Sequence, residues 1–445
     1  MRLNVRPIYS ETTHEGAPAF PHMTAEQRLR RSVMSCLLWE SEFYEDGQSI
    51  ADRIAKAAGE VPLDVLARAA IEARSQFNLR HAPLLLLALL AKCGTGSHVV
   101  SDTIAEVIQR ADEPGEFLSI YWKMNPPPAG KRKAPLSAQV KKGLARALAK
   151  FDAYQLAKYD RDAAVKLRDV LFMVHAKPRD DENAALYRGV ADRSLESPDT
   201  WEVALSAGAD KKETFERLIR DGKLGYLALL RNLRNMAQAG CDPALVRDAI
   251  VARKGGAHRV LPFRYVAAAR AAPQFEPALD QALSEAISEL PPLPGTTVVM
   301  VDVSGSMGDK LSAKSDLTRR DAAAALASII HGDLRVFSFS DKIIEVPPRR
   351  GMAGVDAIAK SQSHSGTYLG AALKVVNEQV PHDRLIVITD EQSHDRVPDP
   401  VAKRAYMINV ASARNGVGYG RWLHLDGFSE RVLGFIHEHE RAGTR

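Results

Sequence analysis

A run of β-branched and apolar residues beginning at Thr296 ends in the oxygen-rich sequence DVSGSM at Met307. The run predicts a buried strand, and its polar end predicts a loop at the carboxyl edge of that strand. Open α/β sheets bind their ligands at this edge. The segment therefore predicts a sheet domain late in the chain and a candidate site within it.

The spacing of the polar residues predicts a metal site. Asp302, Ser304 and Ser306 alternate in sequence, so their side chains would point the same way on an extended backbone. Carboxylate and hydroxyl oxygens suit Mg²⁺, Mn²⁺ or Ca²⁺, and suit zinc or copper poorly. Two more residues stand where they could complete the coordination: Thr367 at a glycine-marked helix start, and Asp390 at the end of the apolar run LIVIT. We expect a divalent cation, with Mg²⁺ the first choice, although DVSGS alone could also be an ordinary polar turn.

Strand-like and helical segments alternate after residue 291, which predicts a doubly wound, mostly parallel sheet. Expected strands cover 296–303, 334–340, 385–389, 405–410 and 422–426, and expected helices cover 316–331, 367–378, 398–404 and 429–440. The sequence HEHE at 437–440 is expected to be a solvated helix end rather than a metal tract, because its two histidines do not share a helix face.

The region before this domain is helical in pattern. Short periodic segments are separated by Gly, Pro or Asp breaks, and strand-like alternation is hard to find. Expected helices cover 24–38, 50–58, 63–75, 83–92, 99–111, 137–148, 155–174, 184–191, 201–205, 211–221, 224–239, 243–252, 265–271 and 277–289. Many short helices without one obvious core predict helix pairs stacked as a HEAT-like repeat, although the sequence has no strict internal period.

Prolines mark the domain boundaries. Residues 1–22 contain Pro7, Pro18 and Pro21 and are expected to form an arm, and the sequence LPPLPG at 290–295 ends the helical region. We place a helical-repeat domain at 1–290 and an α/β domain at 291–445. The predicted fold class is therefore multidomain, with an all-α HEAT-like repeat followed by a doubly wound α/β domain.

Composition is that of a soluble globular protein, with 45% apolar and 26% charged residues and a formal net charge of only +5 over 445 residues. The three cysteines lie far apart, which argues against a disulfide framework or a zinc knuckle and fits a reducing compartment. The N-terminus has no apolar signal sequence, and no apolar run is long enough to cross a bilayer. We expect a cytoplasmic, monomeric protein that does not contact membranes.

The positive charge is concentrated at residues 131–180, which hold thirteen Lys or Arg against five Asp. Such a stretch is often only a solvated helical face. Here four aromatic residues lie within it or just before it: Tyr121, Trp122, Tyr154 and Tyr159. Because aromatic rings stack on exposed bases while cations follow phosphates, the combination favours single-stranded RNA over duplex DNA.

The loop 302–306, followed in order by Thr367 and Asp390, resembles the metal-ion-dependent adhesion site (MIDAS) of von Willebrand factor A domains. The resemblance implies that Ser304, Ser306 and Thr367 contact the metal directly and that Asp302 and Asp390 act mostly through water. It also implies that one coordination position is left for an acidic group of a partner.

The helical region resembles the TROVE module of the Ro ribonucleoprotein family. The segments that carry the resemblance are SAQVKKGLARALAKFDAYQLAKYDRD, LRDVLFMVHAKP, TWEVALSAG, KKETFERLIRDGKLGYLALLRNLRNM and VLPFRYVAA. The resemblance implies a ring of HEAT-like helices beside a von Willebrand A domain. It further implies RNA binding without catalysis: Y RNAs on the outer basic surface, single-stranded 3′ ends of misfolded noncoding RNAs in the hole, and a 3′-to-5′ exoribonuclease as partner.

Residue by residue, the resemblance places RNA contacts on Lys158, Arg161 and His175. Charge and proximity in sequence add three lysines to these candidates: Lys141, Lys142 and Lys177. His175 follows an apolar helical run, where a lone histidine is as readily a core or helix-terminal residue.

Two functions of different classes follow. The first is an RNA-binding scaffold in RNA quality control or maturation, with no enzyme activity. The second is an adaptor whose metal site engages another protein, such as an AAA+ ATPase, in which case the basic stretch is ordinary surface. The sequence contains no GxxxxGK[ST] and no GxSxG frame at Ser304, so a nucleotide-hydrolysing site and a serine-hydrolase site are not supported.

Overall fold

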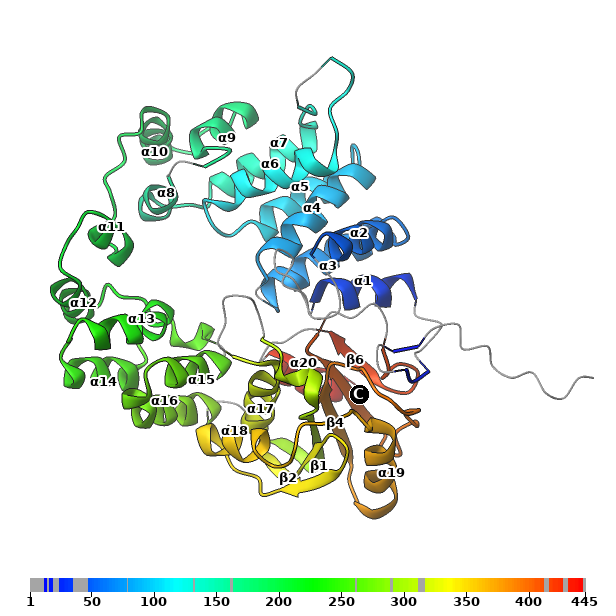
Figure 1. Ribbon diagram of the computed structural model, residues 1–445. Helices are drawn as coiled ribbons and strands as arrows, with labels where there is room; N and C mark the ends of the chain where they lie inside the picture. The colour runs from blue at the N-terminus through cyan, green and yellow to red at the C-terminus, as the bar shows by residue number, and fades with distance from the viewer. Residues whose placement is uncertain are drawn as a thin grey trace, which may run out of the picture. The chain divides into compact units, whose positions relative to one another are not determined.

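The computed structural model describes residues 12–13, 16–18, 24–34, 47–77, 79–130, 133–160, 163–260, 262–288, 291–310, 317–411, 416–426 and 431–442. Helices make up the first part and a six-stranded sheet the last (Figure 1). The described residues form two compact units, one within residues 24–34 and 47–199, the other within residues 200–442 together with residues 12–13 and 16–18. The change from helix to sheet near residue 290 thus falls inside the second unit.

The first unit is built from short helices packed against one another, with α3 on α4 and α5 on α7. Its helices are α1 (Ala25–Met34), α2 (Gly47–Ala58), α3 (Leu63–Ser75), α4 (His81–Cys93), α5 (His98–Val107), α6 (Glu113–Met124), α7 (Ala138–Leu148), α8 (Ala153–Tyr159), α9 (Leu167–Val174) and α10 (Asp181–Asp192). Helix α4 is buried along its length from Ala82 to Ala91, as its continuous apolar sequence requires. Helix α6 was not expected from the sequence, because Pro114 and Gly115 suggest a break, yet proline is well accepted in the first turn of a helix.

The second unit begins with six more helices: α11 (Trp201–Ser206), α12 (Lys211–Arg220), α13 (Tyr226–Gln238), α14 (Pro243–Ala252), α15 (Pro262–Ala271) and α16 (Glu276–Ser288). Side-chain caps start several helices of both units, among them Ser137, Asp152 and Asp210. No helix in the described ranges is both long enough and apolar enough to span a bilayer.

The sheet has the strand order β3-β2-β1-β4-β5-β6, and every neighbouring pair is parallel except β2 and β3. The strands are β1 (Leu293–Asp302), β2 (Gly332–Phe339), β3 (Ile343–Val346), β4 (Arg384–Thr389), β5 (Arg404–Asn409) and β6 (Leu423–Asp426). The flanking helices are α17 (Arg319–Ile329), α18 (Gly351–Ala359), α19 (Leu369–Gln379) and α20 (Arg431–Ala442). Helices α17, α18 and α20 pack on one face and α19 on the other, so the doubly wound fold is confirmed.

The predicted fold class, a helical repeat followed by a doubly wound α/β domain, is therefore confirmed. Two expected elements are wrong. The single helix expected over 155–174 is two helices, α8 and α9, with non-helical residues 163–166 between them, and residues 398–403 are not helical. Pro398 and Pro400 each lack a backbone donor and restrict the residue before them, which disfavours a helix there.

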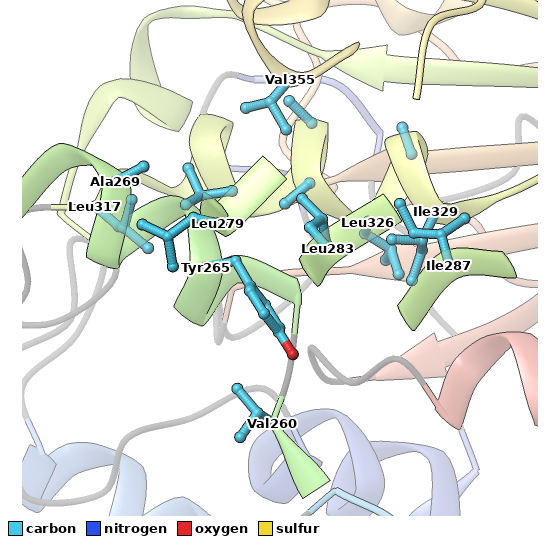
Figure 2. Close-up of a cluster of buried hydrophobic side chains, with 14 of the residues drawn as sticks. Val260, Tyr265, Ala269, Leu279, Leu283, Ile287, Leu317, Leu326, Ile329 and Val355 are labelled. Atoms are coloured by element: carbon cyan, nitrogen blue, oxygen red, sulfur yellow. The ribbon is translucent and has the colours of Figure 1, made fainter. Parts of the chain in front are cut away.

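Helices α15 and α16 pack directly on the α/β domain. Figure 2 shows the shared core, in which Leu283 and Ile287 of α16 lie beside Leu326 and Ile329 of α17. At its edge the Asp280 carboxylate accepts a hydrogen bond of 2.8 Å from the amide of Met352 and so caps α18 from another helix. The last helices of the repeat and the sheet thus share one core.

Candidate functional site

The first part of the candidate metal site lies where β1 ends. Asp302 and Ser304 are fully buried. The amide of Ser304 donates to Asp302 Oδ1 at 2.9 Å, and the hydroxyls of Ser304 and Ser306 lie 3.3 Å apart. A turn at Gly305–Gly308 carries Ser306 back toward the strand end. The structure thus brings together the three residues that the alternating spacing predicted.

The second part comes from β4, the parallel neighbour of β1. Asp390 follows the last residue of β4 and is fully buried. Thr389, which the sequence analysis did not single out, donates from its hydroxyl to Asp302 Oδ2 at 2.6 Å. Burial raises the pKa of Asp302 above its usual range, and the nearby carboxylate of Asp390 raises it further.

Thr367 reaches the same edge of the sheet from the loop before α19, and it is buried. Its amide donates to His394 Nδ1 at 3.1 Å and its carbonyl accepts from the amide of His394 at 2.8 Å. The amide of Gly305 donates to the carbonyl of Ser365 at 2.8 Å. These bonds hold the three loops that follow β1, precede α19 and follow β4 side by side.

The donor set fits a hard divalent cation. Among the described residues, the groups that shift the pKa of Asp302 most are Asp390, Ser304 and Thr389, and none of them is basic. No three His, Cys, Asp or Glu side chains cluster as a metal site within the described residues, so binding here would depend on the Ser and Thr hydroxyls. Two carboxylates with three hydroxyls are typical ligands of Mg²⁺, Mn²⁺ or Ca²⁺. The metal itself stays a prediction.

Further polar residues line this strand edge and were not predicted. Glu391, Gln392, Ser393 and Asn409 are all fully buried. Glu391 has a left-handed backbone with φ of 60° and its carboxylate lies 3.0 Å from His424 Nδ1. The polar run DEQS directly after an apolar strand was the sequence signal, because polar residues at a strand's carboxyl end usually serve the site.

Part of the expected N-terminal arm packs beside this edge. Thr13 donates from its hydroxyl to the carbonyl of Ser393 at 2.7 Å, and the amide of Ala17 donates to the same carbonyl at 3.1 Å. Thr13 and Ala17 are both buried. The described residues of the arm are therefore docked on the loop that follows Asp390.

The candidate RNA residues lie on helices α7 to α9 and just after them. Lys158 lies on α8, with its ammonium 5.6 Å from the ring centre of Tyr154 and 5.9 Å from that of Tyr159. His175 ends α9 in a left-handed conformation with φ of 51° and an exposed side chain, so it is a helix-terminal residue and not a core one. Lys142 and Lys177 are exposed and Lys141 is half-buried, whereas Arg161 lies outside the described residues.

The four aromatic residues near the basic stretch differ in their contacts and in their exposure. Trp122 donates to the carbonyl of Ala134 at 3.0 Å, and Tyr121 to that of Pro135 at 3.1 Å, so both rings hold the loop before α7. Tyr159 is covered by the guanidinium of Arg110, 4.8 Å from its ring centre. Tyr154 on α8 is 50% exposed, and Phe172 on α9, which sequence reasoning missed, is 56% exposed.

Some basic side chains of residues 131–180 bind other parts of the fold and are not available to a ligand. The ammonium of Lys150 donates to the last carbonyls of the α5 region, at Ala105 and Ile108. Arg146 pairs with Asp102. The cations that remain accessible are thus fewer than the sequence count suggests, and they include Lys142 and Lys177.

Comparisons with known proteins agree with the fold. Residues 188–289 match the family model described as the TROVE domain. Telomerase protein component 1 of Rattus norvegicus is 30% identical over 143 residues, which are 30% of this chain and 5% of that protein. Its counterpart in Mus musculus is 26% identical over 214 residues, which are 46% of this chain and 8% of that protein. This chain therefore spans less than a tenth of either relative.

The crystal structure of the RO (RSR) protein of Deinococcus radiodurans has the same fold, with a TM-score of 0.59 and 19% sequence identity. The match covers 93% of this chain and 98% of that chain. It therefore includes both the helical repeat and the α/β domain. The TROVE match runs from the end of α10 to α16, so the predicted RNA residues at 141–177 lie outside it.

Proposed function

Residues 188–289 match the TROVE domain, and from this premise we propose that the chain binds noncoding RNA as a Ro-type ribonucleoprotein. Its proposed ligands are Y-like RNAs and the single-stranded 3′ ends of structured or misfolded RNAs. Its proposed setting is RNA maturation or quality control in the cytoplasm, together with a 3′-to-5′ exoribonuclease. The protein holds RNA in this proposal and performs no covalent step, and passage of 3′ ends through a helical ring rests on the family resemblance alone.

One observation carries the proposal: two exposed aromatic rings accompany cations on consecutive helices. We define the α8–α9 surface as Tyr154, Lys158, Phe172, His175 and Lys177. Helices α8 and α9 both pack on α10, which fixes them within one unit (Figure 1). Exposed aromatic rings accompanied by cations are the combination with which proteins bind single-stranded nucleic acid.

Single-stranded RNA is the partner that suits this chemistry. A base that stacks on Tyr154 or Phe172 would contribute about 1–3 kcal/mol, and this contribution depends little on sequence because every base has a π face. The lysines would meet the phosphates between the bases. Since the rings lie on short helices with exposed ends, an unpaired strand can reach them, whereas the bases of a duplex are hidden from a stacking contact.

The test is a binding titration by fluorescence anisotropy. A labelled RNA duplex with a single-stranded 3′ tail should bind more tightly than a blunt duplex, and log K should fall with log salt by about 0.7 for each phosphate contacted. Tyr154→Ala with Phe172→Ala should weaken binding of the tailed RNA by about 1–3 kcal/mol per stacked base. Lys158→Ala with Arg161→Ala should weaken it as well and should lower the salt slope.

Two matched controls come from the same chain. Lys56→Ala removes an exposed lysine of α2, and Leu227→Ala removes an apolar side chain of α13 that is 40% exposed. Neither should change RNA affinity. Equal affinity for tailed and blunt RNA, or equal losses in the controls and in the α8–α9 variants, would refute RNA binding at this surface.

A second function, metal-dependent binding of a protein, is favoured by the rim of the candidate metal site. Tyr368 is 42% exposed and stacks on His394 at 5.1 Å, directly beside Thr367. A divalent cation held by Asp302, Ser304, Ser306, Thr367 and Asp390 would offer its open position to a partner's carboxylate. The partner in this proposal is the exoribonuclease, or an AAA+ ATPase if the chain is an adaptor without RNA.

The absorbance ratio at 260 and 280 nm of protein purified in low salt separates the two. A raised ratio that falls after ribonuclease treatment supports the RNA-binding function. A protein free of nucleic acid that retains a partner in Mg²⁺ and releases it in EDTA would support the adaptor instead.

A further inference from the structure

A cavity lies in the α/β domain, at the edge of the sheet opposite the candidate metal site. It has a volume of about 460 Å³ and is lined by the start of β5, by residues 421–423 that lead into β6, and by the end of α20. The strands β1, β4, β5 and β6 are parallel, so their amino ends and their carboxyl ends gather at opposite edges. The cavity is at the amino ends, and Asp302 and Asp390 are at the carboxyl ends.

The cavity is rich in cations. Lys403, Arg404 and Arg421 line it, and Glu440 is the one carboxylate among its lining residues in the described part of the chain. Glu440 is already engaged. It accepts from Nε of the fully buried Arg384 at 2.6 Å and from the hydroxyl of Tyr406 at 2.9 Å, and it lies 3.3 Å from Arg404.

The other two cations have no such partner. Lys403 and Arg421 are exposed, and neither forms an ion pair with a carboxylate of the described residues. Although burial opposes the charge of Glu440, the hydrogen bonds from Arg384 keep the pKa of that carboxyl below its usual range. The carboxylate of Glu440 therefore stays ionised, and Arg384, Tyr406 and Arg404 already contact it. Because it does not neutralise Lys403 or Arg421, the mouth of the cavity is positive.

Aromatic side chains form a further part of the wall, beside Ala405 and Leu423. Trp422 and Tyr406 are buried with only 7% and 1% exposure, and the ring of His439 meets Tyr406 edge to face at 6.3 Å. A hollow of this size can hold a nucleotide-sized ligand. Guanidinium and ammonium groups bind phosphate oxygens, while an aromatic wall suits a sugar or a base.

We propose that this cavity binds the phosphate group of a nucleotide, with Lys403 and Arg421 as its cationic contacts and Trp422 beside the base or sugar. The phosphate comes from a free nucleoside monophosphate or from one nucleotide of an RNA chain, since the same groups recognise both. The site belongs to the α/β domain and uses none of the residues of the α8–α9 surface. A negative result for nucleotide binding at this cavity would therefore leave the proposed RNA binding at the α8–α9 surface untouched, and the reverse also holds.

The first test titrates the full-length protein with AMP and with inorganic phosphate, by calorimetry and by tryptophan emission. The chain has four tryptophans. AMP should change the emission, and Trp422→Phe should remove most of that change. The double variant Lys403→Gln with Arg421→Gln should bind AMP at least about tenfold more weakly, since each lost charged contact is of that order.

The matched control is Lys374→Gln, which neutralises an exposed lysine of α19 in the same domain and should leave AMP binding unchanged. Thermal unfolding of each variant checks that the domain stays folded. Tyr154→Ala with Phe172→Ala should also leave AMP binding unchanged, whatever it does to RNA.

A labelled ten-nucleotide RNA distinguishes the two sources of phosphate. If the Lys403 and Arg421 double variant loses affinity for both the RNA and AMP, the site serves an RNA nucleotide; if it loses AMP alone, the site serves a free nucleotide. The proposal is overturned if the wild type binds neither AMP nor phosphate at millimolar concentration. It is also overturned if the double variant binds AMP as the wild type does, or if poly-glutamate competes better than AMP and so reveals an acidic protein partner.

Discussion

Replacing Asp302 with asparagine should reverse the order of stability between wild type and variant when divalent cation is removed. Asp302 is fully buried near the carboxylate of Asp390, and both facts raise its pKa. Without a cation a neutral side chain of the same size relieves this repulsion, so the variant should be as stable as wild type or more stable by about 1 kcal/mol. The local bonds can survive, because the amide oxygen can accept from the amide of Ser304 and the amide nitrogen can donate to the hydroxyl of Thr389.

With the cation the order should invert. A ligand present at 100 times its Kd stabilises the folded state by about 2.7 kcal/mol. For a domain the size of the α/β domain each kcal/mol corresponds to about 2–4 °C, so saturating Mg²⁺ should raise the Tm of that domain in the wild type by about 5–10 °C. The variant has lost one of the two carboxylates and should gain at most about 1 kcal/mol from the same Mg²⁺.

Differential scanning calorimetry in EDTA and over a MgCl₂ titration measures both parts, and Asp399→Asn supplies the control because that carboxylate is exposed on the same domain. An equal rise in Tm for wild type and Asp302→Asn would refute the metal site. A variant already less stable by more than about 2 kcal/mol in EDTA would refute the repulsion argument. RNA affinity should be unchanged in Asp302→Asn, because RNA is proposed to bind the helical repeat.

Two further predictions concern packing and pH. Gly351→Ala should destabilise the α/β domain by about 2–4 kcal/mol in chemical denaturation. Gly351 has a φ of 63°, and an added methyl group would clash with the Asp280 carboxylate that caps α18. An unchanged denaturation midpoint would show that this contact is dispensable. Burial, with Arg80 and Arg110 next in effect, lowers the pKa of His81 to about 4. The neutral His81 therefore contributes fully to the free energy of unfolding above about pH 6.5, and this contribution is lost as the pH falls toward 4. The loss should be about 1–2 kcal/mol after allowance for the partial exposure of the side chain, and His81→Gln should remove this pH dependence.

The sheet, and the position of Asp302 and Asp390 at its edge, could be predicted because their signals are local. A buried parallel strand needs a continuous apolar run, and the residues after it must occupy the ligand-binding edge, so Asp302 and Asp390 could be placed from sequence alone. Thr367 could be placed only by its order along the chain and by the family resemblance. The loops that hold it beside β1 and β4 depend on backbone hydrogen bonds that no sequence pattern marks.

Exposure of individual side chains could not be predicted in the same way. Tyr121 and Tyr154 are equivalent in a count of aromatic residues near a basic stretch, yet the first is buried against the loop before α7 and the second is half exposed. Phe172 lies in an apolar run that predicts burial, but the short helix α9 buries only the side formed by Leu171 and Val174. Which face a short helix buries is decided by its neighbours.

The sequence HEHE at the end of α20 illustrates this limit, since the prediction of a solvated helix end is wrong for Glu440. Its carboxylate binds Arg384, 56 residues earlier in the chain, and Arg384 is fully buried. The same guanidinium donates to the carbonyl of Pro294 at 3.0 Å and to the hydroxyl of Thr297 at 2.6 Å. Glu440 is therefore the counter-charge of a cation placed between β1 and β4.

Glu440→Gln should consequently destabilise the α/β domain by about 3–5 kcal/mol, because it leaves a buried guanidinium without its counter-charge. The matched control is Glu345→Gln, which breaks a pair of similar geometry with Arg335 on the exposed β2–β3 hairpin, where Nε and Oε1 are 2.7 Å apart. That pair should contribute far less to stability, since solvent screens it. Urea denaturation at pH 7 measures the difference, and lowering the pH should remove it, because the pKa of Glu440 is depressed in the folded state and its contribution is lost as that carboxylate becomes protonated. If the two variants lose equal stability, burial of Arg384 is not what makes its ion pair matter.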